Sequence, residues 1–225
     1  MELAPGIHQI EGVRGANSFL AIVGDGAAVI DTGMPGNEKK IVGYCKEVGV
    51  EPGRLLYILL THPDIDHSGS VAALRGLTGA KVAIHEADAP RLSGQKSLKE
   101  AKGAMRLVFG LMTPLMRFTP AQPNVLLKDS DRILDLEVVH TPGHTDGSVC
   151  FLRDGVALFV GDALRTDSEG RPALPPGAMT VDMDLAKKSI QRIAGLHYQL
   201  LLPGHGRPIT EGASAAMEAF AKGLG

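Results

Sequence analysis

Short apolar runs of strand length recur along the chain and limit what it can fold into. Three of them lie near the N-terminus, at Gly6–Ile10, Ser18–Val23 and Ala27–Ile30, and the segment Gly24-Asp25-Gly26 predicts a β-hairpin between the last two. No apolar stretch approaches 18 residues, so the sequence predicts neither a membrane-spanning helix nor a membrane partner. We expect further strands at Leu55–Leu60, Val82–Ile84, Arg132–Leu134, Glu137–His140, Val149–Arg153, Val156–Val160 and Leu200–Leu202.

Amphipathic segments lie between these runs. Their apolar spacing predicts helices at Glu38–Val48, Val71–Leu77, Asp184–Leu196 and Ala213–Ala221. Strands and helices do not follow a strict βαβ order, which favours layers of helices packed on mixed sheets. Because the 225 residues contain no internal repeat and no Pro/Ser-rich linker, we expect a single domain, 1–225.

Charge and cysteine content exclude several classes of protein. The chain has 23 basic and 25 acidic residues and no run of more than two Lys or Arg, so we expect no nucleic-acid partner. The N-terminus lacks a basic segment followed by an apolar one, and Cys45 and Cys150 are too few for a disulfide framework. These features favour a cytoplasmic protein. Cys150 lies in an apolar run, where we expect it to be buried.

Histidine and aspartate residues stand where four of the predicted strands end. The string Thr61–His67 follows the run Leu55–Leu60 directly, and single residues in three later loops repeat the pattern beside Gly or Pro. One such residue is more often solvated or a helix cap, but four loops with the same placement predict a metal site. Imidazole nitrogen and carboxylate oxygen are standard ligands of divalent metals. The candidate ligands are His62, Asp64, Asp66, His67, His144, Asp162 and His205.

These motifs resemble those of the metallo-β-lactamase superfamily over nearly the whole chain. The segment Asn17–Gly33 resembles the family's opening hairpin and the turn beneath its metal site, and Thr61–His67 resembles its His-x-His-x-Asp-His signature. Thr-Pro-Gly-His-Thr, Val-Gly-Asp and Pro-Gly-His-Gly then follow in the family's order. The resemblance implies an α+β fold: a four-layer αββα sandwich of two mixed β-sheets flanked by helices, with metals at one rim of the sheets.

The resemblance also implies two divalent metal ions and a reaction. A hydroxide shared by two cations is a nucleophile at neutral pH and attacks a carbonyl, while one cation stabilises the oxyanion. Asp66 is the candidate catalytic residue, because a carboxylate beside that water can orient it and carry a proton to the leaving group. By motif position, His62, Asp64 and His144 would hold one ion, Asp66, His67 and His205 the other, and Asp162 would bridge both.

Asp64 departs from the family pattern, which has a histidine at this position. A carboxylate still donates an oxygen ligand, but it favours harder ions than imidazole does. The flavodiiron relatives on this fold have a glutamate there and hold two irons. Zinc is therefore our first expectation for the metal, with iron and manganese as alternatives.

The predicted function is a metal-dependent hydrolase that acts on a small-molecule lactone, thioester or carboxylic ester. The sequence has no Gly-x-Ser-x-Gly, Walker A or Gly-x-Gly-x-x-Gly motif, which excludes serine hydrolases, nucleotide triphosphatases and dinucleotide enzymes. Two alternatives stay open. One is an iron-binding oxidoreductase of the same fold, of diiron or persulfide-dioxygenase type. The other is a non-catalytic binding protein that metal stabilises.

The segment 97–118 interrupts the strand pattern with apolar residues at helical spacing, which predicts a helical insertion near the active site. Its methionines suit an apolar substrate group, or packing in a homodimer, because methionine packs adaptably. His85 follows a short strand and is a further candidate for the cleft. The candidate substrate-binding residues are thus Met105, Met112, Met116 and His85.

Overall fold

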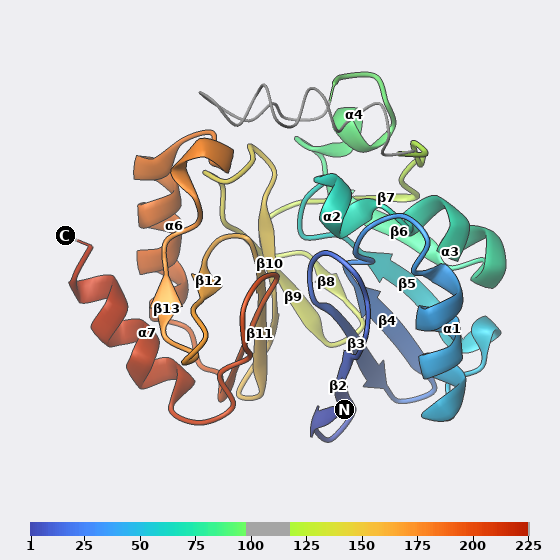
Figure 1. Ribbon diagram of the computed structural model, residues 1–225, viewed down its shortest axis with the longest axis horizontal. Coiled ribbons are helices and arrows are strands. Elements are labelled where there is room, and N and C mark those ends of the chain that lie inside the picture. The colour runs from blue at the N-terminus through green and yellow to red at the C-terminus, as the bar shows by residue number, and fades with distance from the viewer. Residues whose placement is uncertain (98–117, 225) are drawn as a thin grey trace. The chain divides into compact units, whose positions relative to one another are not determined.

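The computed structural model describes residues 1–97 and 118–224 (Figure 1). The chain divides into two compact units, Met1–Leu127 and Lys128–Gly225, and each is described by itself. The single domain that the sequence predicts stays a prediction. The predicted insertion 97–118 lies outside the described residues except for its two end positions, so Met105, Met112 and Met116 are not described.

The N-terminal unit is built on a seven-stranded sheet whose strands follow the order of the chain. Neighbours from β1 to β4 pair antiparallel, whereas β4, β5, β6 and β7 pair parallel. The four parallel strands end at the same edge of the sheet, which places the loops that follow them together. The strands are β1 Glu2–Ala4, β2 Ile7–Ile10, β3 Ser18–Val23, β4 Gly26–Ile30, β5 Leu55–Leu59, β6 Lys81–His85 and β7 Val125–Leu127.

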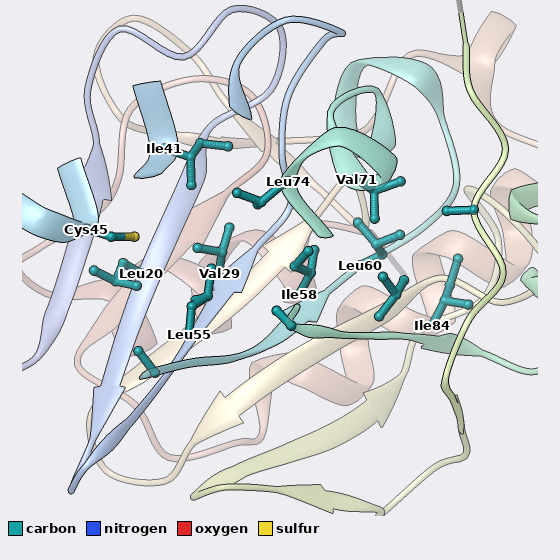
Figure 2. Close-up of a cluster of buried hydrophobic side chains, with 14 of the residues drawn as sticks. Leu20, Val29, Ile41, Cys45, Leu55, Ile58, Leu60, Val71, Leu74 and Ile84 are labelled. Atoms are coloured by element: carbon teal, nitrogen blue, oxygen red, sulfur yellow. The ribbon is translucent and has the colours of Figure 1, made fainter. Parts of the chain in front are cut away.

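Helices α1 (Glu38–Glu47) and α3 (Val71–Thr78) pack on this sheet through their apolar faces. Figure 2 shows Ile41 and Cys45 of α1 and Leu74 of α3 above strand residues such as Val29. These side chains are at most 2% exposed and form the core that the helical spacing predicts. The unit also contains α2 Ile65–Ser68, α4 Ala89–Leu92 and the short 3₁₀ helix η1 Pro52–Arg54.

The C-terminal unit is built on a five-stranded mixed sheet in the order β14-β11-β10-β9-β8. Strands β14 and β11 pair parallel, and the other neighbours pair antiparallel. Helices α6 Met183–Ala194 and α7 Ala213–Lys222 bury Ile190, Ile193 and Met217 in its core. The strands of this sheet are β8 Arg132–Ile133, β9 Leu136–His140, β10 Val149–Arg153, β11 Ala157–Gly161 and β14 Leu200–Pro203. The unit also contains a separate two-stranded sheet of β12 Arg165–Thr166 and β13 Pro172–Ala173, and the 3₁₀ helix η3 Gly177–Met179.

The predicted elements outside 97–118 are confirmed, with ends that differ by one or two residues. The hairpin at Gly24-Asp25-Gly26 joins β3 to β4, and Cys150 is fully buried on β10, as expected. The prediction that the whole of Thr61–His67 is a loop is wrong at its end, because α2 begins at Ile65. Strands β1, β7, β12 and β13 were not predicted, because segments of two or three residues rarely show the apolar alternation that marks a strand. Among the described residues, no helix is both long enough and apolar enough to cross a membrane.

Candidate metal centre

The N-terminal ligand cluster, which consists of His62, Asp64, Asp66 and His67, lies where β5 ends. Two residues separate His62 from the end of β5, and the short helix α2 carries Asp66 and His67. Both histidines are fully buried. Their ring centroids are 4.0 Å apart, and their ligand atoms lie within 4.8 Å of each other. His62 and His67, five residues apart in the chain, thus lie within reach of one cation.

A hydrogen-bond relay orients both imidazoles of this cluster. The Asp31 carboxylate, which follows β4, lies 2.8 Å from Nδ1 of His67 and accepts hydrogen bonds from the amide and hydroxyl of Thr61 at 2.9 and 2.7 Å. The Thr61 hydroxyl lies 3.0 Å from Nδ1 of His62. With Nδ1 engaged in each ring, Nε2 is the nitrogen that each histidine offers to a metal. A carboxylate behind a histidine is the usual support of a metal ligand.

Asp31 holds this position in a rare backbone conformation. Its φ of 56° lies in the left-handed region that non-glycine residues seldom adopt, although Asp and Asn adopt it most readily. Its side chain is 2% exposed, and its carbonyl accepts a hydrogen bond from Ser18 Oγ at 2.9 Å. A strained and buried residue of this kind is typical of a functional site.

The backbone of α2 is fastened to the loops around it. The amide of Thr32 donates to the carbonyl of His67 at 2.6 Å, and the Thr32 hydroxyl donates to the same oxygen at 3.0 Å. The amide of Ala16 donates to the carbonyl of Asp66 at 3.0 Å. These bonds fix the main chain at two adjacent candidate ligands, so their side chains start from a rigid base.

The C-terminal ligand cluster, His144, Asp162 and His205, follows the ends of three strands of the second sheet. Asp162 comes directly after β11, His205 after β14, and His144 after β9. The Asp162 carboxylate lies between the two imidazoles: Oδ2 is 3.6 Å from Nε2 of His144, and Oδ1 is 3.6 Å from Nε2 of His205. Each oxygen of this one carboxylate therefore faces a different histidine.

The spacing of these atoms fits a shared cation better than direct hydrogen bonds. Hydrogen bonds between nitrogen and oxygen are about 2.7–3.2 Å long, so 3.6 Å is too far. Two ligand atoms, each about 2.1 Å from one tetrahedral ion, stand about 3.4 Å apart. Nε2 of His62 and Oδ2 of Asp64 are also 3.6 Å apart, so both clusters repeat the same spacing. The donor types, the burial and the spacing all suit a divalent metal.

The remaining predicted site residue, His85, ends β6 and is 7% exposed. Its Nδ1 accepts a hydrogen bond from the amide of Ala87 at 3.3 Å, which is a local contact. Its role in substrate binding stays a prediction. The sequence analysis missed Asp31 and Thr61 as site residues, although each directly follows a buried strand run. Their position at the end of a strand run, next to the candidate ligands, is the sequence signal that could have identified them.

Comparisons with known proteins place this chain in a family. Residues 12–205 match the sequence profile of the metallo-beta-lactamase superfamily. A Bacillus subtilis (strain 168) protein named probable metallo-hydrolase YflN is 31% identical, over 93% of this chain and 87% of its own length.

Two solved structures are similar over most of their length. BJP-1, a subclass B3 metallo-beta-lactamase of Bradyrhizobium japonicum, is 21% identical with a TM-score of 0.72, over 100% of this chain and 89% of its own. TTHA1623 in a di-iron-bound form is 28% identical with a TM-score of 0.66, over 89% and 92%. The predicted fold class, two mixed sheets with flanking helices, is confirmed by these structures and by both sheets described above. The chain belongs to the metallo-β-lactamase superfamily.

Proposed function

We propose that this protein is a metal-dependent hydrolase of an ester-like carbonyl: a lactone, a thioester or a carboxylic ester. The observation that carries the proposal is the relay from Asp31 through Thr61, which engages Nδ1 of His62 and His67 and leaves Nε2 of both for a Lewis-acidic ion. Membership of the family and the relative named as a probable metallo-hydrolase support the same reading.

The proposed centre would hold two divalent ions. The family's motif order supports this assignment, and so does the Asp162 carboxylate, whose two oxygens face different histidines at 3.6 Å. Asp162 would therefore serve as a ligand together with either histidine. By the family's motif order, His62, Asp64 and His144 would hold one ion, Asp66, His67 and His205 would hold the other, and Asp162 would be shared.

In the proposed mechanism, bound divalent ions supply Lewis acidity that activates water and polarises the substrate carbonyl. The chain's own residues do the rest. Asp66 accepts the proton of the attacking water on its carboxylate and returns it to the leaving group. His67 is held by Asp31 through its imidazole and by Thr32, which donates to its carbonyl. These contacts fix the main chain of α2 next to Asp66.

An iron-dependent oxidoreductase is the second candidate function. Asp64 supports it, because a carboxylate in place of a histidine favours harder ions. The similarity to TTHA1623 in a di-iron-bound form supports it as well. A non-catalytic protein that metal stabilises is the third candidate. Chelator-sensitive turnover would exclude it.

Metal content separates these candidates. We would measure it by mass spectrometry on the full chain purified without chelators, and assay the same sample with p-nitrophenyl esters, thiolactones and thioesters. Two zinc ions and turnover that stops with chelator support the hydrolase. Two irons would favour an oxidoreductase that reacts with oxygen or peroxide, and one iron would favour a persulfide-oxidising enzyme. A chain that takes up no metal on reconstitution would overturn the proposal.

Asp64→Ala is the matched variant for the ligand assignment. We expect it to lose about half of the bound metal and most of the activity, because it removes a ligand of one ion only. Asp25→Ala, in the exposed turn between β3 and β4, is the control and should keep both. Full metal and full rate in Asp64→Ala would show that Asp64 is not a ligand.

A further inference from the structure

Asn37 stands directly before helix α1, where an asparagine side chain usually accepts a hydrogen bond from the first turn of the helix. Among the described residues, its side chain bonds instead to the main chain of two loops. The amide of Arg14 donates to its Oδ1 at 3.1 Å, and its Nδ2 donates to the carbonyls of Arg14 and Met34, each at 2.9 Å. Asn37 is 2% exposed, so these bonds are shielded from water.

The loop that contains Arg14, residues 11–17 between β2 and β3, reaches a candidate metal ligand. The amide of Ala16 in this loop donates to the carbonyl of Asp66 at 3.0 Å. Gly15 lies so close that a Cβ there would stand 2.9 Å from the same oxygen. Since Asn37 bonds to both main-chain groups of Arg14, it fixes the loop that holds the main chain of Asp66.

A second buried side chain, Ser70, links Asn37 to the next candidate ligand. Its hydroxyl accepts from the amide of Asn37 at 2.8 Å and donates to the carbonyl of Met34 at 2.7 Å. The amide of Ser70 donates to the hydroxyl of Thr32 at 3.2 Å, and that hydroxyl donates to the carbonyl of His67 at 3.0 Å. This second arm therefore ends on the main chain of His67.

We call the side chains of Thr32, Asn37 and Ser70 the Asn37 network. Each of these residues is at most 2% exposed, and each of their side-chain polar atoms is hydrogen-bonded. The space around them is filled: Gly33 has a φ of 66°, and a Cβ there would stand 2.5 Å from Nδ2 of Asn37. A buried polar network whose groups are all satisfied fixes one arrangement of the segments that it joins.

The Asn37 network acts on one part of the N-terminal ligand cluster. Its two arms end on the carbonyls of Asp66 and His67, which are consecutive in α2. The imidazole of His62 faces the hydroxyl of Thr61, which belongs to the relay from Asp31. In the proposed ligand assignment, Asp66 and His67 hold one ion and His62 holds the other. The network therefore bears on one ion of the two.

We propose that Asn37 and Ser70 are positioning residues that hold Asp66 and His67 where a single metal ion can bind both. The inference rests on the proposed function and deepens it, because it names what sets the affinity for one ion of the centre. Loss of a group that supports a metal ligand lowers metal affinity by about 10- to 100-fold. We expect the lower end of that range, since the network acts through the main chain of the ligands.

Ser70→Ala is the first test, and Thr78→Val is its matched control. The Thr78 hydroxyl, at the other end of α3, also accepts from one amide, that of Ala80 at 3.2 Å, and donates to one carbonyl, that of Leu74 at 2.8 Å. Both variants should therefore lower Tm by similar amounts. Titration of the metal-free chain with zinc against a competing chelator should show one of two binding steps weakened about tenfold in Ser70→Ala and neither in Thr78→Val.

Asn37→Ala removes the bonds to the loop 11–17 and provides a readout that needs neither metal nor turnover. Hydrogen exchange of the metal-free chain, followed by NMR, should be faster at the amide of Ala16 than in the parent, because that amide is bonded to Asp66. The zinc step that Ser70→Ala weakens should weaken further in Asn37→Ala. If Asn37→Ala does not fold, Ser70→Ala decides the question.

Three results would overturn the inference. The first is zinc affinity in Ser70→Ala equal to that in Thr78→Val. The second is an equal loss at both zinc-binding steps, because the variant would then loosen the whole unit. The third is an Ala16 amide that stays protected in folded Asn37→Ala. The proposed function fails separately: if zinc binds with the expected pattern but no ester is hydrolysed with any metal, the positioning role stands without the hydrolase. A chain that binds neither zinc nor iron would overturn both.

Discussion

The two ligand clusters are built differently. In the N-terminal cluster, Asp31 and Thr61 engage Nδ1 of both histidines at 2.8 to 3.0 Å, and His62 and His67 are fully buried. In the C-terminal cluster, the ligand atoms of Asp162 and the two histidines face one another at 3.6 Å, and the His205 side chain is 39% exposed. The first cluster is oriented by protein groups. Both clusters contain nitrogen–oxygen pairs 3.6 Å apart, so the second differs from the first mainly in the exposure of His205.

This difference follows from what each cluster is attached to. The N-terminal ligands lie at the edge of four parallel strands and on a helix whose backbone is fastened by Thr32 and Ala16. The C-terminal ligands come from three separate loops, each with glycine or proline near the ligand. The His205 side chain is the most exposed among the candidate histidines of the two clusters, so we expect metal removal to loosen the His205 loop before the N-terminal cluster. The following predictions test that contrast.

The largest effect is expected for Asp162→Ala. It removes the one carboxylate that faces both histidines of the C-terminal cluster, so at least one metal ion should be lost and turnover should fall on the order of a thousandfold. Metal analysis and ester turnover measure this. Asp167→Ala, which removes an acidic residue paired with Arg171 in the same unit, is the control. Unchanged metal in Asp162→Ala would contradict the bridging role.

Asp31→Asn should have the next largest effect. Asparagine tolerates the φ of 56°, so the backbone stays in place, but the amide is uncharged and no longer stabilises the His67 tautomer that offers Nε2. We expect metal affinity to fall about 10- to 100-fold, measured by titration against a competing chelator. Asp25→Asn is the matched control. If Asp31→Asn bound metal normally, preorganisation by the relay would be wrong.

Metal removal should next have different effects on the two clusters of one molecule. An ion that binds only the folded state, at a free concentration about a thousand times its Kd, stabilises that state by about 4 kcal/mol. Chelation should therefore lower Tm by about 10 °C. Hydrogen exchange should quicken at Gly204 and Gly206 in the C-terminal cluster. The Thr61 amide, bonded to Asp31 at 2.9 Å, should stay protected. Equal loss of protection in both places would refute the contrast.

The smallest effect concerns the two thiols, one in each unit. Burial raises the pKa of Cys45 to about 11 and that of Cys150 to about 12, so both thiols are protonated at pH 8 and shielded from reagents. Neither should react with a thiol reagent in the folded protein, with or without metal, and both should react after denaturation. Rapid labelling of Cys150 after chelation would show that metal loss opens the core of the C-terminal unit and not only its loops.

The sequence by itself determined most of the elements and the family. Strand runs such as Leu55–Leu60 and helix patterns such as Asp184–Leu196 depend on local periodicity, which a single chain displays directly. Each candidate ligand follows a strand in the chain, Asp162 directly and the others within eight residues of the strand end. The motifs also predicted the superfamily that the profile match later showed. Substrate and metal identity are not local properties, and they stay predictions.

Only the tertiary structure decided which groups support the ligands. Asp31 and Thr61 are 30 residues apart, and their hydrogen bond exists because β4 and β5 pair in parallel and end at the same edge. The main-chain hydrogen bond from the amide of Val181 to the carbonyl of His144 likewise joins two segments that are far apart in sequence. The spacing of apolar residues indicates which face of a single segment is buried in the core. Contacts between distant segments depend on sheet register and loop closure, which no local pattern encodes.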